Sequence, residues 1–150
     1  MLEFLEESII IVDLIQQLKR DEGLRLTAYR DTLGFWTIGY GHHDGSVKLG
    51  DTITEAEAET LLIADIKVAA KRLIDTCPWM ATLDEVRFAA LVNMSFQLGN
   101  KVFQFKKTLG HLRNKEYNKI VEQGMKSLWA KQTPNRAKRV LSQLATGRWH

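Results

Sequence analysis

Residues 21–43 read DEGLRLTAYRDTLGFWTIGYGHH, and they carry the clearest signal of how the chain folds. Between Tyr29 and Tyr40 it is rich in aromatic and β-branched residues, which favour strands. Glycines at positions 34, 39 and 41, followed by two more at 45 and 50, are typical of turns or bulges between short strands. The pattern predicts a small antiparallel sheet within residues 26–53.

Helical patterns flank this sheet on both sides. Apolar residues recur at helical spacing from Ile9 to Leu18, which predicts a first helix that ends near Asp21 or Glu22, where Gly23 stops it. After the sheet, TEAE at residues 54–57 matches a capping box, in which the Thr hydroxyl and the Glu carboxylate bind free backbone N–H groups. A long helix over about residues 55–75 is therefore expected.

The second half of the chain predicts a helical lobe. Residues 84–99 read DEVRFAALVNMSFQLG and are apolar on nearly every face, so this helix must be surrounded by others. Shorter helices are expected around residues 103–113, 117–126 and 134–145, the last started by Thr133 with Pro134 in its first turn. We therefore predict an α+β fold in one domain, with a sheet lobe at about 23–55, a connecting helix at about 55–75 and a helical lobe at about 76–150 that includes the N-terminal helix.

The composition is that of an ordinary globular protein, with 45% hydrophobic and 26% charged residues among 150. Cys77 is the only cysteine, which excludes an intramolecular disulfide and a cysteine-based metal cage. The apolar run at residues 8–15 is short, is interrupted by Asp13 and follows three glutamates, so we interpret it as an amphipathic helix rather than a secretory signal. No other segment approaches the length of a membrane span.

The net charge of +3 conceals opposite charges in the two halves of the chain. Residues 1–75 carry fourteen acidic and eight basic side chains, whereas residues 76–150 carry four acidic and thirteen basic side chains. A basic half can attract nucleic acid or an anionic cell-wall polymer, and long-range attraction of either kind does not depend on sequence. The charge distribution therefore does not distinguish a nucleic acid from an anionic cell-wall polymer as the partner.

Two carboxylates and a threonine in the opening stretch are candidates for chemistry. Glu22 lies at the end of the first helix, Asp31 follows nine residues later at the start of the sheet, and Thr37 lies six residues further on. Carboxylates on different elements can face each other across a cleft, but most Asp and Glu side chains are solvated surface groups. Asp31 can also open a turn over residues 31–34, and Thr37 can be an ordinary strand residue.

Three blocks of the sequence carry a resemblance to one family. Residues 21–43 closely resemble the catalytic region of the T-even-type phage lysozymes, or endolysins, in which a Glu, an Asp and a Thr stand at these spacings. Residues 84–99 resemble the central helix of that family, and QTPNRAKRV at 132–140 with TGRW at 146–149 resembles its C-terminal segment. The blocks occur in the same order and span residues 18–149, so the chain is identified as a member of this family.

The resemblance implies a lysozyme-like fold with an active-site cleft between the sheet lobe and the helical lobe. It implies a bacteriolytic muramidase that hydrolyses the β-1,4 bond between N-acetylmuramic acid and N-acetylglucosamine in peptidoglycan, with inversion, and lyses the host cell. Glu22 would be the general acid, and Asp31 the ionised partner that holds the attacking water together with the Thr37 hydroxyl. Spacing in sequence gives no carboxylate separation, so inversion rests on the resemblance.

The resemblance also implies further residues of the site. Arg136 is expected to contact Glu22 across the cleft, which favours the ionised carboxylate, so we expect desolvation or bound substrate to raise its proton affinity again. His42 is expected to pair with Asp65 on the long helix, as a structural pair that joins sheet and helix. His43 stands where the family has an apolar residue, and we expect it to alter the contacts with the sugar.

The exposed end of the central helix is the remaining candidate for sugar binding. The family lines its cleft at the positions of Asn93, Phe96 and Gln97, although Phe96 can equally be a core residue and the two amides can be caps. Trp129 and Trp149 are interpreted as packing residues rather than as platforms for sugars.

We expect no metal and no other cofactor. His42 and His43 are adjacent, but the other histidines, His111 and His150, do not fall at ligand spacing. The expected partner is the glycan strand of bacterial peptidoglycan, and we expect a monomer that binds no nucleic acid and does not insert stably into a membrane. The protein would stay in the host cytoplasm until a holin releases it to the periplasm and cell wall.

Three other functions fit parts of the sequence. A lytic transglycosylase cleaves the same bond with one catalytic Glu and would not need Asp31 together with Thr37. A non-catalytic wall-binding or tail-structural module could keep the scaffold, although retention of Glu22 with the other two residues argues against it. A nucleic-acid-binding protein is suggested only by the basic half, which lacks a recognition motif.

Overall fold

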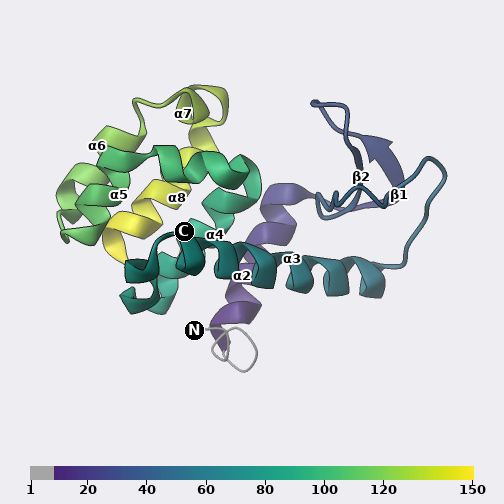
Figure 1. Ribbon diagram of the computed structural model, residues 1–150, viewed down its shortest axis with the longest axis horizontal. Coiled ribbons are helices and arrows are strands. Elements are labelled where there is room, and N and C mark those ends of the chain that lie inside the picture. The colour runs from purple at the N-terminus through teal and green to yellow at the C-terminus, as the bar shows by residue number, and fades with distance from the viewer. Residues whose placement is uncertain (1–8) are drawn as a thin grey trace. The chain divides into compact units, whose positions relative to one another are not determined.

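The computed structural model describes residues 9–150, with side chains described from residue 12 onward. The chain divides into two compact units at the bond between Val68 and Ala69, within a long helix. The elements, with η for 3-10 helices, are labelled in Figure 1 and follow in this order: α2 (Ile9–Glu22), β1 (Arg25–Arg30), β2 (Trp36–Gly39), α3 (Glu55–Thr76), η1 (Pro78–Thr82), α4 (Glu85–Leu98), η2 (Gly99–Gln104), α5 (Lys106–Arg113), η3 (Tyr117–Lys119), α6 (Ile120–Gly124), α7 (Leu128–Gln132) and α8 (Pro134–Thr146).

This mostly helical chain with a two-stranded antiparallel sheet confirms the predicted α+β class. The lobe boundaries expected from the sequence, including the assignment of the N-terminal helix, stay a prediction. The three glutamates that precede the first helix lie outside the described residues. Among residues 9–150, no helix combines the length and the apolar character that a membrane span requires.

In the first unit, α2 ends where the sequence predicts. Gly23 has a φ of +71°, a backbone conformation that residues with a Cβ rarely adopt. Its N–H donates to the Lys19 carbonyl over 3.0 Å, which closes the last turn of the helix. Leu14, Ile15 and Leu18 form the buried face of α2, as the helical spacing of apolar residues requires.

The sheet is shorter than the predicted region of residues 26–53. β1 and β2 are antiparallel, with Tyr29 opposite Thr37 and Arg30 opposite Trp36. Beyond β2 the pairing continues only as isolated bridges, Thr27 with Thr52 and Ile38 with His42. The glycines at positions 41, 45 and 50 have φ values of +73°, +88° and +89°, which are incompatible with an extended strand.

The predicted capping box at the start of α3 is confirmed. The Glu57 N–H donates to Thr54 Oγ1, and the Thr54 N–H donates to Glu57 Oε1, each over 3.1 Å. These two bonds satisfy backbone donors that a helix start leaves free. The helix then runs to Thr76, within one residue of the predicted end.

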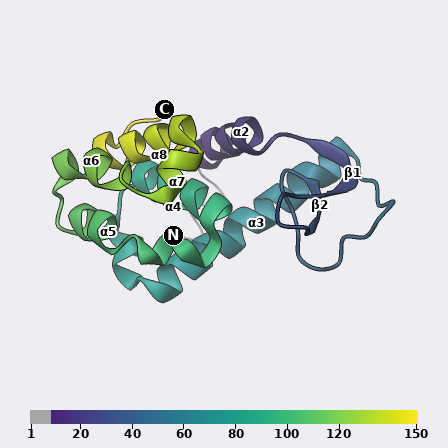
Figure 2. The same ribbon diagram turned by 90° about the horizontal axis from the view of Figure 1, so that it is seen from above.

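In the second unit, α4 is the buried element that the sequence predicts. Asp84 caps its start by accepting a hydrogen bond from the Arg87 N–H over 3.0 Å. Every residue from 88 to 95 is buried, so the helix has no solvent-facing side along two turns. α8 packs against α4, and α6 and α7 pack against α8, as Figure 2 shows within this unit.

Several short helices of the second unit differ from the prediction. The single helix expected around residues 103–113 is divided into η2 and α5, and the helix expected at 117–126 is η3 followed by α6, which ends at Gly124. The sequence did not predict η1 or α7, because five residues are too few to show a helical period. Pro134 does begin α8, but the Thr133 hydroxyl donates back to the Trp129 carbonyl instead of capping it.

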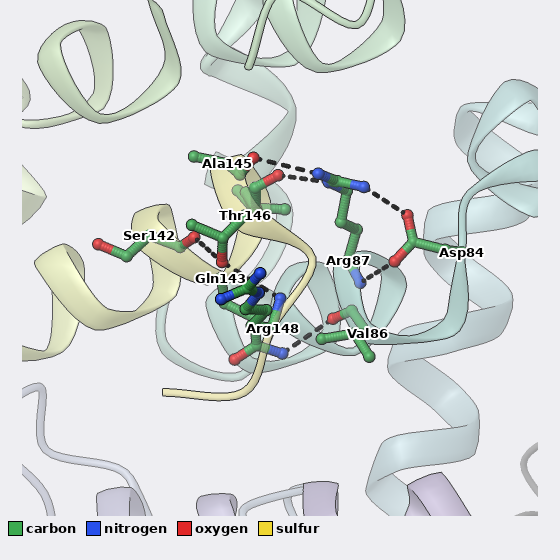
Figure 3. Close-up of polar contacts among 9 residues, drawn as sticks. Asp84, Val86, Arg87, Ser142, Gln143, Ala145, Thr146 and Arg148 are labelled. Carbon is green, nitrogen blue, oxygen red and sulfur yellow. Dashed lines mark hydrogen bonds and ion pairs between the residues drawn. The ribbon is translucent and has the colours of Figure 1, made fainter. Parts of the chain in front are cut away.

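Arg87 of α4 joins this helix to the C-terminal end of α8, as drawn in Figure 3. Its Nε donates to the Leu144 carbonyl over 2.7 Å and its Nη2 to the Ala145 carbonyl over 3.1 Å. Its Nη1 donates to Asp84 Oδ1 over 3.0 Å, and its guanidinium carbon lies 3.8 Å from the ring centroid of Tyr117. One side chain thus satisfies carbonyls that the end of a helix leaves without partners.

Candidate active site

Glu22 is the last residue of α2 and is half-buried. Its carboxylate lies against the backbone of the turn after β2, because a Cβ added at Gly41 would lie 3.0 Å from Glu22 Oε2. Gly41 is therefore the residue that leaves room for this carboxylate. The helix end and the sheet together position Glu22, and Gly23 fixes where the helix ends.

Asp31 builds the turn between β1 and β2. Its Oδ1 accepts hydrogen bonds from the Leu33 N–H and from the Phe35 N–H, each over 2.9 Å. The backbone closes the same turn, because the Gly34 N–H donates to the Asp31 carbonyl over 3.0 Å. The turn-opening interpretation of Asp31 is thus confirmed, and both side-chain bonds use the same carboxylate oxygen.

Thr37 lies on β2 and its side chain is buried, with 2% of the residue exposed. Its hydroxyl donates to the Phe35 carbonyl over 2.8 Å, so the oxygen keeps its lone pairs as acceptors. The Phe35 carbonyl also accepts from the Asp31 N–H over 3.0 Å. Asp31 and Thr37 are therefore both held by the backbone of Phe35.

Tyr29 is a site residue that the sequence analysis missed. Burial is the main cause that raises the pKa of Tyr29 above its ordinary value of 10.0, and the carboxylates of Glu22 and Asp31 raise it further. The Arg25 guanidinium, 4.3 Å from the ring centroid, lowers the pKa instead. Because such charge effects weaken with distance, both carboxylates lie in the surroundings of one phenol. No local pattern in the sequence indicates this group, because the pairing of β1 with β2 is irregular between Arg25 and Tyr29.

His42 pairs with Asp65, as the family resemblance implies. Its Nδ1 lies 2.8 Å from Asp65 Oδ2 on α3, and its Nε2 lies 3.3 Å from Asp44 Oδ2. The hydroxyl and the N–H of Ser46 both donate to the Asp44 carboxylate, and the bond from the hydroxyl is the main cause that lowers the pKa of Asp44 from 3.8 to about 2. The imidazole thus lies between two carboxylates of the first unit.

His43 stacks on Phe35, with ring centroids 5.4 Å apart and the ring planes at 8°. Both residues are exposed, and Phe35 keeps 52% of its surface accessible. The flat apolar surface of such a pair suits the apolar face of a sugar ring. Sequence analysis placed His43 at the substrate but did not predict that Phe35 supports it.

The candidate residues of the second unit lie on α4 and α8. Asn93 was expected at an exposed helix end, and this is wrong, because the residue is completely buried within α4. Arg136 of α8 donates from Nε to Asn93 Oδ1 over 3.1 Å and from Nη2 to the Asn93 carbonyl over 3.4 Å. The predicted contact between Arg136 and Glu22 stays a prediction.

Gln97 lies one turn further along α4 and is half-buried. Its Oε1 accepts from the Trp129 indole N–H over 2.8 Å, and its Nε2 donates to Thr133 Oγ1 over 3.2 Å. Phe96 beside it is also half-buried. Trp129 keeps 5% of its surface exposed, in line with its interpretation as a packing residue. Among the residues that the structure describes, no three His, Cys, Asp or Glu side chains gather as a metal site.

The geometry of the first unit allows acid–base chemistry at a sugar. It holds a half-buried carboxyl group against a turn, and a second carboxylate that two backbone N–H groups fix in place. General-acid cleavage of a glycosidic bond uses one protonated carboxyl and one ionised carboxylate in different surroundings. Glu22 and Asp31 lie in such different surroundings, and both carboxylates raise the pKa of Tyr29.

Known proteins are similar to this one over most of the chain. Residues 19–148 match the family model described as Phage lysozyme. The chain is 35% identical to "Probable T4-type lysozyme 1" of Dictyostelium discoideum over 157 aligned residues, which cover 87% of this chain and 92% of that protein. It is 34% identical to an endolysin of Acyrthosiphon pisum secondary endosymbiont phage 1, covering 79% of this chain and 77% of that protein. The pre-baseplate central spike protein Gp5 of Enterobacteria phage T4 is 32% identical over 91% of this chain and 28% of its own length.

These comparisons confirm the family and the enzyme class that the sequence resemblance implies. The family match includes the helix end at Glu22, the turn at Asp31 and the strand at Thr37. The identity with the first of these relatives extends over most of both chains, so it does not rest on one shared motif. The chain therefore belongs to the phage lysozyme family of glycoside hydrolases.

Proposed function

We propose that this protein is an endolysin that hydrolyses the β-1,4 bond between N-acetylmuramic acid and N-acetylglucosamine in bacterial peptidoglycan. The observation that carries the proposal is the placement of two carboxylates in the first unit, Glu22 against the Gly41 turn and Asp31 on the backbone of the turn between β1 and β2. Two carboxyl groups in one neighbourhood, one against a turn backbone and one fixed by N–H donors, are the groups that glycoside hydrolysis requires.

Glu22 donates the proton in this proposal. The leaving oxygen of a glycosidic bond is a poor base, so it needs a positioned acid as the bond breaks. The turn backbone at Gly41 lies against one side of the Glu22 carboxylate and limits the positions that this group can take. Glu22 then protonates the bridging oxygen while positive charge develops on the sugar carbon.

Asp31 remains ionised and stabilises that positive charge. Its Oδ1 is fixed by two backbone bonds, which leaves Oδ2 to orient the attacking water. The Thr37 oxygen has accepting lone pairs and can take a second hydrogen bond from the same water. Attack from the face opposite the leaving group inverts the anomeric carbon, and the reaction needs only two carboxyl groups and water, without a cofactor.

Each unit offers candidate contacts for a sugar, and each set is proposed by itself. The stacked pair of His43 and Phe35 provides an apolar surface for a sugar ring. Within the second unit, Phe96, Gln97 and Arg136 are the candidates for sugar contact, and the buried Asn93 would act by holding Arg136.

The biological part of the proposal rests on the endolysins among the relatives. We infer that the protein acts as a monomer on the glycan strands of the host cell wall at the end of infection. Release from the host cytoplasm to the wall would depend on a holin.

The test is the lysis of purified peptidoglycan by the wild-type protein and by Glu22→Gln. The amide cannot donate a proton to the leaving oxygen, so the rate of turbidity loss should fall by about 10² to 10⁴-fold. Mass spectrometry of the products should show reducing ends, and NMR of the first product should show the inverted anomer. Anhydro sugars, lighter by one water, would instead establish a lytic transglycosylase, and wild-type rates for Glu22→Gln would refute the role of Glu22.

A further inference from the structure

The second unit contains a cavity of about 380 Å³ that the proposed chemistry does not use. It is lined by η1, by the residues just before α4, by the end of α5 and by the start of η3. Two aromatic residues, Trp79 and Tyr117, lie in this lining together with Leu83 and Leu112. Sites for small molecules begin at about this volume, which has room for one ring with one substituent.

The charges around this cavity leave positive charge in excess. Arg113 and Lys115 contribute two cations, and Asp84 is the one acidic residue of the lining. Arg87 already binds Asp84, because its N–H donates to Oδ2 and its Nη1 to Oδ1, each over 3.0 Å (Figure 3). Within the described part of the chain, neither Arg113 nor Lys115 has an ion-pair partner. The lining therefore favours a ligand with negative charge.

Arg113 is held in a position that suits such a ligand. Its guanidinium carbon lies 5.8 Å from the ring centroid of Trp79, within the range of a cation–π contact. A guanidinium over an aromatic ring keeps N–H donors that can bind a carboxylate or a phosphate in a paired contact. The ring also limits the conformations of this exposed side chain, so less entropy is lost when an anion binds.

Lys115 has a backbone conformation that residues with a Cβ rarely adopt. Its φ of +59° is the only positive value among the non-glycine residues that the structure describes. A glycine would adopt this conformation with less strain. Residues held in such conformations are concentrated at functional sites. At position 115 the strained backbone carries one of the two cations of the cavity.

The neutral groups of the lining also match an anion that carries a ring. The indole N–H of Trp79 can only donate, and it has no hydrogen-bond partner among the described residues. The Tyr117 hydroxyl likewise lacks a partner there, while the Arg87 guanidinium lies 3.8 Å from the centroid of its ring. The rings and leucines offer apolar contact to a flat group, and the donors offer hydrogen bonds to its anionic substituent.

We propose that this cavity binds a small organic anion, in which a flat apolar ring contacts the two aromatic side chains and a phosphate or carboxylate binds Arg113 and Lys115. Such a ligand differs from the glycan of the proposed function, and the site does not depend on that function. A ligand that contacts η1 and the turn after α5 together would stabilise the folded state of the second unit.

Direct binding to the full chain tests this proposal with four probes. Phenyl phosphate and benzoate join a ring to an anion, benzyl alcohol has the ring without the charge, and inorganic phosphate has the charge without the ring. The indole N–H signal of Trp79, assigned by its loss in Trp79→Phe, reports occupancy of the cavity in NMR titrations.

At least one of the two ring anions should shift the Trp79 signal at concentrations about 10-fold below those needed for benzyl alcohol or inorganic phosphate. The stronger of the two identifies the substituent, and it should also raise the Tm in a concentration-dependent way. If benzyl alcohol or inorganic phosphate shifted the signal at the same concentrations as the ring anions, the proposal would be wrong.

Matched pairs of substitutions separate a site from general attraction. Arg113→Gln with Lys115→Gln should weaken binding of the stronger ring anion by about 10-fold, or about 1.4 kcal/mol. Lys131→Gln with Lys138→Gln removes the same charge from exposed lysines that do not line the cavity, and should change binding less than 2-fold, which is about 0.4 kcal/mol. Equal losses in the two pairs would overturn the proposal.

Lys115→Gly guards against a loss of binding that comes from unfolding. Glycine relieves the strain of the positive φ, so the Tm of the free protein should not fall. The variant also removes the ammonium group, so the ring anion should bind about 5-fold more weakly and raise the Tm less. Wild-type binding by this folded variant would exclude Lys115 from the site and contradict the proposal.

Discussion

The backbone of Gly41 lies against the carboxylate of Glu22, and a Cβ at position 41 would lie 3.0 Å from Glu22 Oε2. Gly41 has a φ of +73°, so an L side chain is also strained there by its backbone conformation. Gly50 has a φ of +89° but no heavy atom within 4 Å of the corresponding Cβ position. The two glycines share the backbone requirement, and only Gly41 contacts the proposed acid.

Gly41→Ala should therefore reduce lysis out of proportion to its effect on stability. Both Gly41→Ala and the control Gly50→Ala should lose about 1–2 kcal/mol of unfolding free energy, from the positive φ. Only Gly41→Ala displaces the Glu22 carboxylate, and its lysis rate per folded molecule should fall by about 10-fold or more, as for a misplaced acid. Urea unfolding and peptidoglycan turbidity measure the two effects, and equal lysis by both variants would show that the contact has no role in positioning.

Asp31 has a structural role and a proposed chemical role, and two substitutions separate them. Asp31→Asn keeps an oxygen that can accept from the N–H groups of Leu33 and Phe35, whereas Asp31→Ala loses both bonds. Asp31→Ala should cost about 1–3 kcal/mol of stability, and Asp31→Asn less than that. Both variants should lose lysis, because neither has a negative charge, so full activity in Asp31→Asn would argue against the electrostatic role.

The pH dependence of stability should show the contribution of Asp44. Its pKa is lowered to about 2, mainly by the hydrogen bond from the Ser46 hydroxyl. A carboxyl group with a lowered folded-state pKa stabilises the fold above its ordinary value of 3.8, and this contribution is lost as the pH falls through about 2.

Ser46→Ala should raise the pKa of Asp44 towards 3.8, as measured by carbonyl NMR titration. The difference in Tm between wild type and Ser46→Ala should be largest above pH 3.8 and should shrink as the pH approaches about 2. In an Asp44→Asn background, Ser46→Ala should have no pH-dependent effect. A difference in Tm that stays constant through this pH range would exclude Asp44 as its source.

Arg87 should contribute to the stability of the second unit without affecting the chemistry. Arg87→Lys cannot keep both bonds to the carbonyls of Leu144 and Ala145, because lysine lacks the fork of guanidinium donors. We expect a loss of about 1–3 kcal/mol in urea unfolding, with unchanged lysis per folded molecule. Arg113→Lys is the control, since Arg113 is exposed and should change stability by less than about 0.5 kcal/mol. Similar losses in the two variants would mean that the carbonyl contacts of Arg87 contribute little.

Local signals in the sequence were sufficient for the main elements and for the family. The end of α2 before Gly23, the capping box at Thr54 and Glu57, and the apolar faces of α4 were all predicted correctly. Each of these features depends on residues within one or two turns of each other. The resemblance around Glu22, Asp31 and Thr37 also depends on short spacings, and the match over residues 19–148 confirms the family that it implies.

Features that join distant segments could not be predicted in this way. Asn93 was expected to be exposed, but packing in the second unit buries it and brings Arg136 to it from 43 residues away. Nothing in the sequence around Tyr29 indicates that two carboxylates lie near it and raise its pKa.

Sequence patterns alone predicted the α+β class, the ends of α2 and α3 and the membership in the phage lysozyme family, because capping, periodicity and turn conformation are local properties of the chain. The burial of Asn93 and the grouping of Glu22 and Asp31 around Tyr29 followed only from the tertiary structure. Those outcomes depend on how segments far apart in sequence pack together, and the packing of one segment is set by the shapes of all its neighbours.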